Sequence, residues 1–267
     1  MLNKTQLLPD RPGIPPMAKM PEPEVVDPAA LVEAYRQGEI DLICVLGPTA
    51  SGKTRYAVQL AREMGNAHIL SADSRQVYRG MDIGTGKDFR EYGEVPYHLI
   101  DLVPAGTKYN IYQYQKAFAD AYAADRAAGA IPILCGGSGL YIEAVTRAYK
   151  FEKENGLPAQ ALPRNVFYIG TLVSREERVA RIDRRLEERL QEGLVEEVRG
   201  LLETVSAQDL IYYGLEYKFV TQYLLGELSY EDMVVALGNA IHQFAKRQMT
   251  WFRGMERDGI RIHWVRP

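Results

Sequence analysis

Short apolar runs alternate with helical patterns along the chain from residue 40 onward. Each run has the length of a buried β-strand and is bounded by turn or capping residues. Between the runs, apolar positions recur every three or four residues, as on one face of a helix. This alternation predicts an α/β fold with a mostly parallel sheet flanked by helices. The strands are expected at residues 40–46, 67–73, 97–103, 129–135, 164–172 and 260–265.

Capping residues locate the helices between these strands. Residues 27–38 begin Asp-Pro and end in Gly, which predicts a short helix leading into the first strand. Residues 110–128 form a long helical pattern with alanines on one face. Ser174, with Glu177 three positions later, is a capping box. Ser229 begins the last helix, so the C-terminal portion is expected to be helical.

The first strand enters a complete G-x-x-x-x-G-K-[ST] phosphate loop, and a helix follows at once. Successive N–H groups of such a loop converge on one anion, and the helix N-terminus adds a positive dipole end. The lysine supplies a point charge and the threonine a hydroxyl that can bind Mg²⁺. We therefore predict a P-loop NTPase-like sheet and a diphosphate- or triphosphate-binding site. Its residues are Gly47, Pro48, Thr49, Ala50, Ser51, Gly52, Lys53 and Thr54.

Composition and length indicate one main domain. The 267 residues are 46% hydrophobic and 25% charged, as in ordinary globular proteins. Residues 39–267 are predicted to form a single catalytic domain, preceded by a Pro-rich tail and short helix at 1–38. The net charge of −3 argues against a surface coated in nucleic-acid-binding charge, although a local basic surface can still hold RNA. With no signal pattern and no membrane-length apolar stretch, we expect a cytoplasmic monomer that makes no membrane contact.

Polar residues follow two more of the predicted strands. Asp73 ends the second strand, and ligands in open α/β sheets bind at the carboxyl ends of strands. Asp73 is therefore a candidate base facing the phosphate loop. The turn at residues 136–139, which contains Ser138, brings small residues and N–H groups to the same edge. Arg175 opens a helix directly after a strand, where its guanidinium can enter the crevice.

The remaining candidate groups have structural interpretations. The other arginines of the helix that follows Ser174 are best read as a solvated face balanced by glutamates. Both cysteines lie in apolar runs, as small buried hydrophobes do. The histidines are scattered without metal-ligand spacing, and we interpret all of them as structural. These residues are Cys44, Cys135, His68, His98, His242 and His263.

Six stretches together resemble the tRNA dimethylallyltransferases, also called tRNA isopentenyltransferases. The second and the last of them are far more specific than the phosphate loop. They are GPTASGKT (47–54), SADSRQVYRGMDIGTGK (71–87), YHLIDLV (97–103), PILCGGSGLY (132–141), SREERVARIDRRLEERLQEGLVEEV (174–198) and AKRQMTWF (245–252).

The resemblance implies transfer of a dimethylallyl group from dimethylallyl diphosphate to N6 of adenosine 37, beside the anticodon of tRNA, with release of diphosphate. It implies that Asp73, Ser138 and Arg175 are catalytic, that Mg²⁺ binds Thr54, and that the phosphate loop grips the leaving group. Asp73 then accepts the amine proton, or it only orients the loop or holds Mg²⁺ through water. Ser138, where the family has threonine, has an alternative reading as a turn residue. The tRNA-binding set is Asp73, Ser74, Arg75, Gln76, Lys246 and Arg247, of which the last two have an alternative role at the sheet edge.

One departure from the family is large. Members carry an inserted helical subdomain that clasps the anticodon arm, whereas here a short linker at 142–163 takes its place. The stretch 213–217 before the last helix is also altered. Prenylation of a free adenine nucleotide, which needs no clasp, is therefore an alternative. A phosphate-loop kinase or NTPase using Asp101, and a non-catalytic RNA-binding relative, are weaker alternatives.

Overall fold

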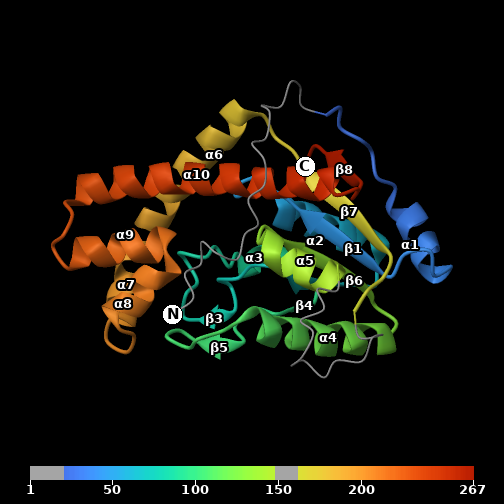
Figure 1. Ribbon diagram of the computed structural model, residues 1–267, viewed down its shortest axis with the longest axis horizontal. Coiled ribbons are helices and arrows are strands. Elements are labelled where there is room, and N and C mark those ends of the chain that lie inside the picture. The colour runs from blue at the N-terminus through green and yellow to red at the C-terminus, as the bar shows by residue number, and fades with distance from the viewer. Residues whose placement is uncertain (1–20, 148–161) are drawn as a thin grey trace.

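A computed structural model describes residues 21–147 and 162–267 of the chain. Within these residues the main sheet has six parallel strands in the order β4-β2-β6-β1-β7-β8, flanked by helices on both faces (Figure 1). This confirms the predicted α/β fold with its mostly parallel sheet. The strands are β1 (Leu42–Leu46), β2 (Ala67–Ser71), β4 (Tyr97–His98), β6 (Ile131–Gly136), β7 (Val166–Thr171) and β8 (Ile262–Val265).

Two hydrophobic clusters lie on opposite faces of this sheet. Because side chains alternate along a strand, Leu42 and Cys44 of β1 join one cluster, whereas Ile43 joins the other. Both cysteines are buried and free, as the sequence predicted. The smaller cluster is covered by α1 (Pro28–Arg36), α2 (Lys53–Met64) and α3 (Phe89–Tyr92).

The larger cluster is covered by the remaining helices. The longest of them, α10, crosses the molecule, and its first half forms a helical arm with α7, α8 and α9 (Figure 1). These helices are α4 (Ile111–Ala127), α5 (Gly139–Thr146), α6 (Arg175–Gln191), α7 (Leu194–Leu201), α8 (Ala207–Tyr213), α9 (Leu215–Leu224) and α10 (Tyr230–Arg257).

The predicted caps are present at three helices. The side chains of Asp27, Ser174 and Ser229 each accept a hydrogen bond from the first turn of their helix. Asn110 caps α4 with a full capping box: its side-chain oxygen accepts from the Gln113 N–H, and the Gln113 side-chain oxygen accepts from the Asn110 N–H. The short-range signals therefore located these helix starts to within about one residue.

Two expectations need correction. Residues 97–103 are not one strand: β4 pairs with β2, whereas β5 (Val103–Pro104) pairs with β3 (Tyr78–Arg79) in a separate small sheet. Leu99 and Asp101, with φ of 69° and 58°, break the extended backbone between them. The C-terminal portion is helical as expected, but the sequence analysis did not identify α7, α8 and α9 as separate helices.

The expected tail at 1–26 falls largely outside the described residues, and so does most of the 142–163 linker, since the gaps are 1–20 and 148–161. Among the helices of the described residues, none combines the length and the apolarity needed to cross a bilayer.

Candidate active site

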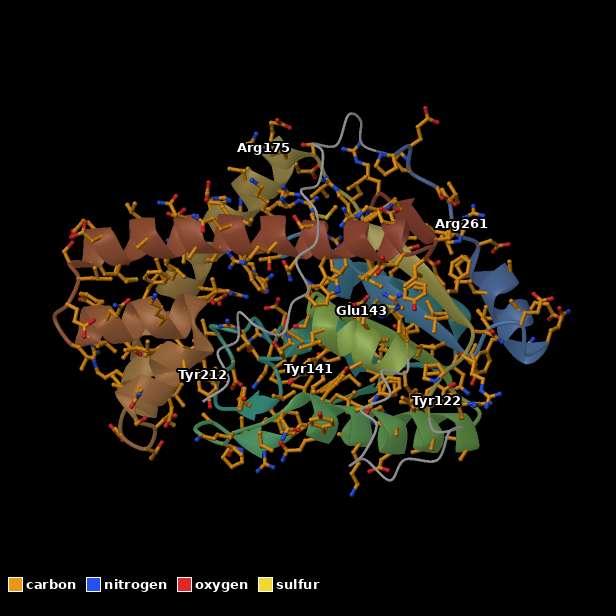
Figure 2. All side chains as sticks on the ribbon, viewed as in Figure 1. Tyr122, Tyr141, Glu143, Arg175, Tyr212 and Arg261 are labelled. Atoms are coloured by element: carbon orange, nitrogen blue, oxygen red, sulfur yellow. The ribbon has the colours of Figure 1, made fainter. Side chains whose placement is uncertain are left out.

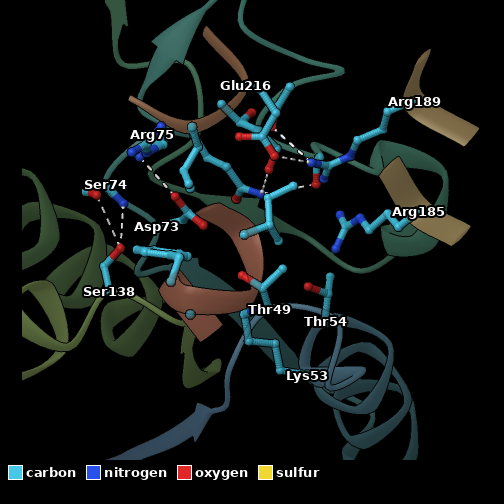
Figure 3. A pocket seen from close by; sticks show the side chains of 18 of the residues that line it. Thr49, Lys53, Thr54, Asp73, Ser74, Arg75, Ser138, Arg185, Arg189 and Glu216 are labelled. Carbon is cyan, nitrogen blue, oxygen red and sulfur yellow. Dashed lines mark hydrogen bonds and ion pairs between the residues drawn. The ribbon is translucent and has the colours of Figure 1, made fainter. Parts of the chain in front are cut away.

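One cavity opens at the carboxyl ends of β1, β2 and β6, where their loops meet α6, α9 and α10 (Figure 3). Lys53 of the phosphate loop and Asp73 both line it, so the anion-binding loop and the candidate base share one pocket. The walls also carry Thr49, Thr54, Ser74, Arg75, Gln76, Ser138, Arg185, Arg189 and Glu216. The cavity therefore brings together Asp73, Ser138, the three residues that follow Asp73, and Thr49, Lys53 and Thr54 of the phosphate loop, which are half of the site residues that the sequence predicted.

The phosphate loop has the backbone shape that an anion cradle needs. Ala50 and Gly52 have φ of 61° and 84°, in the left-handed region, which curls the loop before α2 begins at Lys53. Gly52 is the N-cap of α2 and has no side chain to occupy the first-turn N–H groups. The buried Ser51 side chain anchors the loop to the sheet, because its hydroxyl lies within hydrogen-bond distance, 2.6 Å, of the Thr171 hydroxyl on β7.

Gln248 of α10 braces the phosphate loop, a role that sequence reasoning missed. Its Oε1 accepts from the Thr49 N–H at 2.8 Å, and its Nε2 donates to the Gly137 carbonyl at 2.9 Å. A Cβ at Gly137 would lie 2.4 Å from that Nε2, so glycine is required for the approach. The glycine turn and the KRQMTW stretch, far apart in sequence, therefore form one support for the phosphate loop.

Asp73 and Ser138 face each other across the turn that follows β2. Asp73 Oδ1 accepts from the Arg75 N–H at 2.9 Å, which fixes the carboxylate on the cavity wall. Ser138 Oγ accepts from the Ser74 N–H at 3.0 Å and lies 3.3 Å from the Ser74 hydroxyl (Figure 3). The Ser138 hydroxyl thus holds the turn that carries Asp73, so it has a positioning role in this geometry.

Lys53 is buried, and its surroundings lower the pKa of its ammonium group. Burial lowers its pKa, and the nearby Cys135 and Asp73 oppose that shift. Burial also raises the pKa of the Cys135 thiol to about 12, so this cysteine stays protonated at neutral pH. The negative charge of a bound diphosphate would raise the pKa of Lys53 again.

The structure corrects the expectation for Arg175. It is exposed at the outer start of α6 (Figure 2) and does not line the cavity. The arginines that reach the crevice are one to four turns further along α6, at Arg181, Arg185 and Arg189, spaced four residues apart on one helix face. That spacing was the sequence signal that could have found them. The solvated-face interpretation, expected for most of the arginines of this helix, is wrong for Arg185, which lines the first cavity, whereas Arg184 is exposed as expected.

A second, more open cavity adjoins the first on the side of α6. It shares Lys53 and Thr54 with the first cavity and is lined further by Arg55, Arg90, Arg181 and Arg184, among others. Burial and the neighbouring Arg189 lower the pKa of Arg185, which stands between the two cavities. The second cavity is lined by eight cations against five carboxylates, which gives a protein of net charge −3 a local excess of positive charge.

Arg189 and Glu216 close the far wall. Their side chains are about nine-tenths buried and form an ion pair of 3.0 Å, and Arg189 also donates to the Gly84 carbonyl at 3.0 Å. Glu216 belongs to the stretch 213–217, and Arg75 donates to the Gly214 carbonyl at 3.1 Å. The altered stretch is therefore part of the cavity wall, although the sequence gave it no role.

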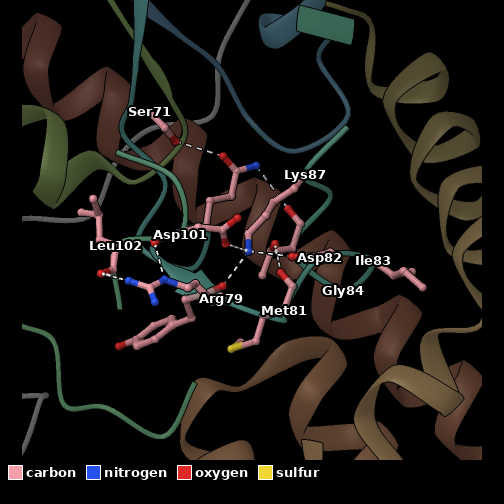
Figure 4. A network of polar contacts seen from close by, with 12 residues as sticks. Ser71, Arg79, Met81, Asp82, Ile83, Gly84, Lys87, Asp101 and Leu102 are labelled. Carbon is pink, nitrogen blue, oxygen red and sulfur yellow. Dashed lines mark hydrogen bonds and ion pairs between the residues drawn. The ribbon is translucent and has the colours of Figure 1, made fainter. Parts of the chain in front are cut away.

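Residues 78–87 form a loop that we name the substrate loop, because Gly84, Thr85 and Gly86 line the first cavity, and a buried lysine holds it in place. Lys87 Nζ donates to the Tyr78 carbonyl, Asp82 and Asp101, at 2.6, 2.8 and 2.5 Å (Figure 4). Asp101 thus contributes to a loop anchor and does not line either cavity, which removes the acidic residue on which the kinase alternative depended. Gln76 reaches the same loop, donating to the Gly86 carbonyl at 3.2 Å.

Lys246 and Arg247 are the two predicted tRNA-binding residues that lie elsewhere. Both are exposed on α10, outside the residues that line the two cavities. Phe244, one turn earlier, does line the first cavity. The two cations therefore take no part in the walls of either cavity, although the Arg247 guanidinium lies over the Phe244 ring at 5.9 Å.

Comparison with known families gives two matches. The family described as IPP transferase matches residues 76–162 and 150–255, and the family described as isopentenyl transferase matches residues 40–94. Among curated proteins, "tRNA dimethylallyltransferase 2" of Bacteroides fragilis is 44% identical over 285 positions, covering 85% of this chain and 93% of the relative. "tRNA dimethylallyltransferase 1" of Parabacteroides distasonis is 46% identical over 283 positions, covering 84% and 92%.

Solved structures agree with the fold. A full-length tRNA isopentenylpyrophosphate transferase from Bacillus halodurans superposes with a TM-score of 0.75 at 28% identity, covering 85% of this chain and 89% of that one. A tRNA delta(2)-isopentenylpyrophosphate transferase from Staphylococcus epidermidis gives a TM-score of 0.71 at 26% identity, covering 84% and 92%.

Proposed function

Because this chain belongs to the IPP transferase family, whose members are tRNA dimethylallyltransferases, we propose how its cavity carries out the transfer. The substrates are dimethylallyl diphosphate and tRNA, and the acceptor is N6 of adenosine 37. The amine nitrogen forms a bond to C1 of the dimethylallyl group as the bond from C1 to oxygen breaks. Diphosphate leaves with the electron pair, and the nitrogen gives up one proton. Since tRNA is the acceptor, the reaction belongs in the cytoplasm.

The diphosphate end of the substrate lies in the phosphate loop. Lys53 and the N–H groups at the start of α2 neutralise the charge that develops on the leaving oxygen. Arg185 on α6 also lines the cavity and stabilises the same negative charge, which is the role that the sequence analysis expected of Arg175. All three groups stabilise the departing anion more than the bound substrate, which is the condition for speeding the chemical step.

Mg²⁺ fits this loop. The Thr54 hydroxyl lies on the cavity wall beside Lys53, and an oxygen donor together with diphosphate oxygens is the ligand set that Mg²⁺ prefers. Bound there, Mg²⁺ supplies positive charge to the leaving group.

Asp73 is the base in this proposal. It is the carboxylate nearest to Lys53 in the same cavity, and this shared cavity is the observation that carries the assignment. Ser74, Arg75 and Gln76 follow it along the wall and offer hydrogen-bonding groups to the flipped-out adenine. Ser138 holds the turn through Ser74, so its effect on the reaction is indirect.

An Asp73→Asn variant separates the two readings of Asp73. The amide oxygen can still accept the Arg75 N–H, so the turn is kept, whereas the basic oxygen is lost. As a base, Asp73 contributes about 10²- to 10⁴-fold to the rate, so the variant should lose that much in single turnovers with labelled dimethylallyl diphosphate. Asp120→Asn, at an exposed position on α4, is the control and should react normally. Activity within a few-fold of the parent would leave Asp73 only an orienting role.

The short form of the enzyme is also a proposal. The alignment with the Bacteroides fragilis relative spans 285 positions, more than the 267 residues of this whole chain, so that relative has residues with no counterpart here. This supports a single domain at 39–267 in which a short linker at 142–163 replaces the inserted subdomain. We propose that tRNA is held by the arginine-lined second cavity and by Lys246 and Arg247, both exposed on α10.

Label transfer tests the acceptor. Labelled dimethylallyl diphosphate is offered with tRNA in one reaction and with AMP in another, at several salt concentrations. Label on tRNA, with an affinity that falls steeply as salt rises, supports the proposal because phosphate contacts release counterions. Label on AMP alone would instead show that the short form modifies the free nucleotide.

A further inference from the structure

Two of the four histidines in the chain meet at one aspartate, on the sheet edge away from the phosphate loop. His68 lies on β2, His98 on the edge strand β4, and Asp125 on α4. His68 Nδ1 lies 2.7 Å from Asp125 Oδ1, and His98 Nε2 lies 3.0 Å from the same oxygen. His68 and His98 lie 57 and 27 positions before Asp125 in the sequence. These are not the short spacings that mark a metal motif, so the sequence did not indicate this cluster.

The aspartate is the buried member of the cluster. Its side chain is 3% exposed, whereas those of His68 and His98 are 21% and 38% exposed. Its second oxygen, Oδ2, is buried without a hydrogen-bond partner among the described residues. A buried carboxylate oxygen without a partner is costly, and a cation bound by this carboxylate would offset the charge that the two oxygens share.

We propose that His68, His98 and Asp125 form a binding site for one divalent transition-metal ion of the Zn²⁺ class. The donors are two imidazole nitrogens and one carboxylate oxygen, which suit Zn²⁺, Co²⁺ or Ni²⁺ and suit Mg²⁺ poorly. All three donor atoms lie within 4.8 Å of one another. The fourth position is open to water, since both histidines reach the surface.

The distances fit an ion with little movement. Ligand atoms about 2.0 to 2.2 Å from a tetrahedral Zn²⁺ lie about 3.3 Å from one another. The two nitrogen-to-oxygen distances here are 2.7 and 3.0 Å, so the imidazoles need to withdraw from Asp125 by a few tenths of an ångström. Their lone pairs then replace the N–H groups that face the carboxylate in the metal-free form.

The position of Asp125 on its helix adds an electrostatic argument. It lies two residues before the end of α4, where the helix dipole presents its negative end. A carboxylate at this end of a helix is unfavourable by itself. A divalent cation would offset both the carboxylate and the helix end.

A bound metal ion would connect the short edge strand β4 to the rest of the main sheet. The edge strand β4 has only two residues, and beyond it the chain continues to Asp101, which holds Lys87 under the substrate loop. Metal binding would tie β4 to β2 and α4 at the start of that path. The proposal does not depend on the roles assigned to the active-site residues.

The test is metal binding to untagged protein, cleared of metal and kept in excess Mg²⁺ to fill oxygen-only sites. Zn²⁺ titrated by calorimetry should bind with a stoichiometry of one, and Co²⁺ should give the visible absorption of a low-coordinate site. His68→Gln and His98→Gln should each weaken Zn²⁺ binding by at least about tenfold. His242→Gln is the matched control, because His242 pairs with Asp183 at 2.7 Å but belongs to no group of three possible ligands among the described residues.

A second readout does not depend on any variant folding. Nitrogen-detected spectra of the histidine rings in the parent protein should shift for two histidines on adding Zn²⁺ and stay unchanged for the other two. The count of two shifted rings comes from the parent protein alone, and the loss of one shifted signal in His68→Gln and of the other in His98→Gln assigns the pair. Absence of stoichiometric binding, or binding that the His68 and His98 variants leave unchanged, would show a plain hydrogen-bonded cluster and overturn the proposal.

Discussion

Glu197 of α7 holds the substrate loop through the backbone. Its Oε2 accepts from the N–H groups of Asp82 and Ile83, at 2.9 and 2.7 Å. Its Oε1 accepts from the Gly84 N–H at 3.1 Å and the Tyr217 hydroxyl at 2.7 Å. Gly84 lines the first cavity, so this one carboxylate fixes part of the wall against the helical arm.

Glu197→Gln keeps the shape and removes the charge. One oxygen becomes an NH₂ group, which suits the Tyr217 hydroxyl but leaves the Gly84 N–H facing a donor. An unpaired buried N–H costs about 1 to 3 kcal/mol. The two remaining backbone bonds lose their charge assistance, which is about half of their strength. We therefore expect the free energy of unfolding to fall by about 2 to 4 kcal/mol.

Urea unfolding measures this effect, with a decrease in midpoint of about 1 M expected for a protein of this size. Glu196→Gln is the control, because Glu196 is exposed and makes only a 3.8 Å ion pair with Arg199, worth under about 1 kcal/mol. The catalytic efficiency of Glu197→Gln should also fall, because the cavity wall moves. If both variants unfold at the same urea concentration, the other contacts of the loop, from Lys87, Arg189 and Gln76, hold it without Glu197 and the reasoning fails.

Three further outcomes are expected. Burial lowers the pKa of Lys53 below its ordinary 10.5, and bound diphosphate should raise it again, so binding should take up protons at pH values between the pKa of the free protein and that of the complex. Calorimetry in buffers of different ionisation enthalpy measures this uptake, and a Lys53→Met variant should show none. Gly84→Ala would place a Cβ 2.6 Å from the Tyr217 ring and should lower the free energy of unfolding by about 1 to 3 kcal/mol in thermal or urea melts; an unchanged melt would mean that the loop yields freely. Arg185→Gln should reduce kcat for prenyl transfer by about 10²-fold, whereas Arg175→Gln should leave it close to normal, and the reverse order would restore the role first expected of Arg175.

Local signals carried much of the prediction. The phosphate loop, its flanking strand and helix, and the helix caps depend on residues a few positions apart, and the structure confirms them. Asp73 was placed correctly because a residue just past a parallel strand must lie at the carboxyl edge of the sheet. The motifs were also specific enough to identify the family.

Long-range packing decided the rest. Whether Arg175 or Arg185 enters the crevice depends on how α6 crosses the sheet, which no short stretch of sequence specifies. Gln248 meets Thr49 across 199 positions of sequence, and Glu197 meets Gly84 across 113.

The sequence by itself determined the order of strands and helices in the core of the chain, the anion-binding loop and the position of Asp73 beside that loop. Only the tertiary structure decided which cations surround that loop, what holds the substrate loop in place, and that His68 and His98 converge on Asp125. The physical reason is that backbone preferences and caps act over a few residues, whereas a side-chain cluster exists only once the sheet order brings separate elements into contact.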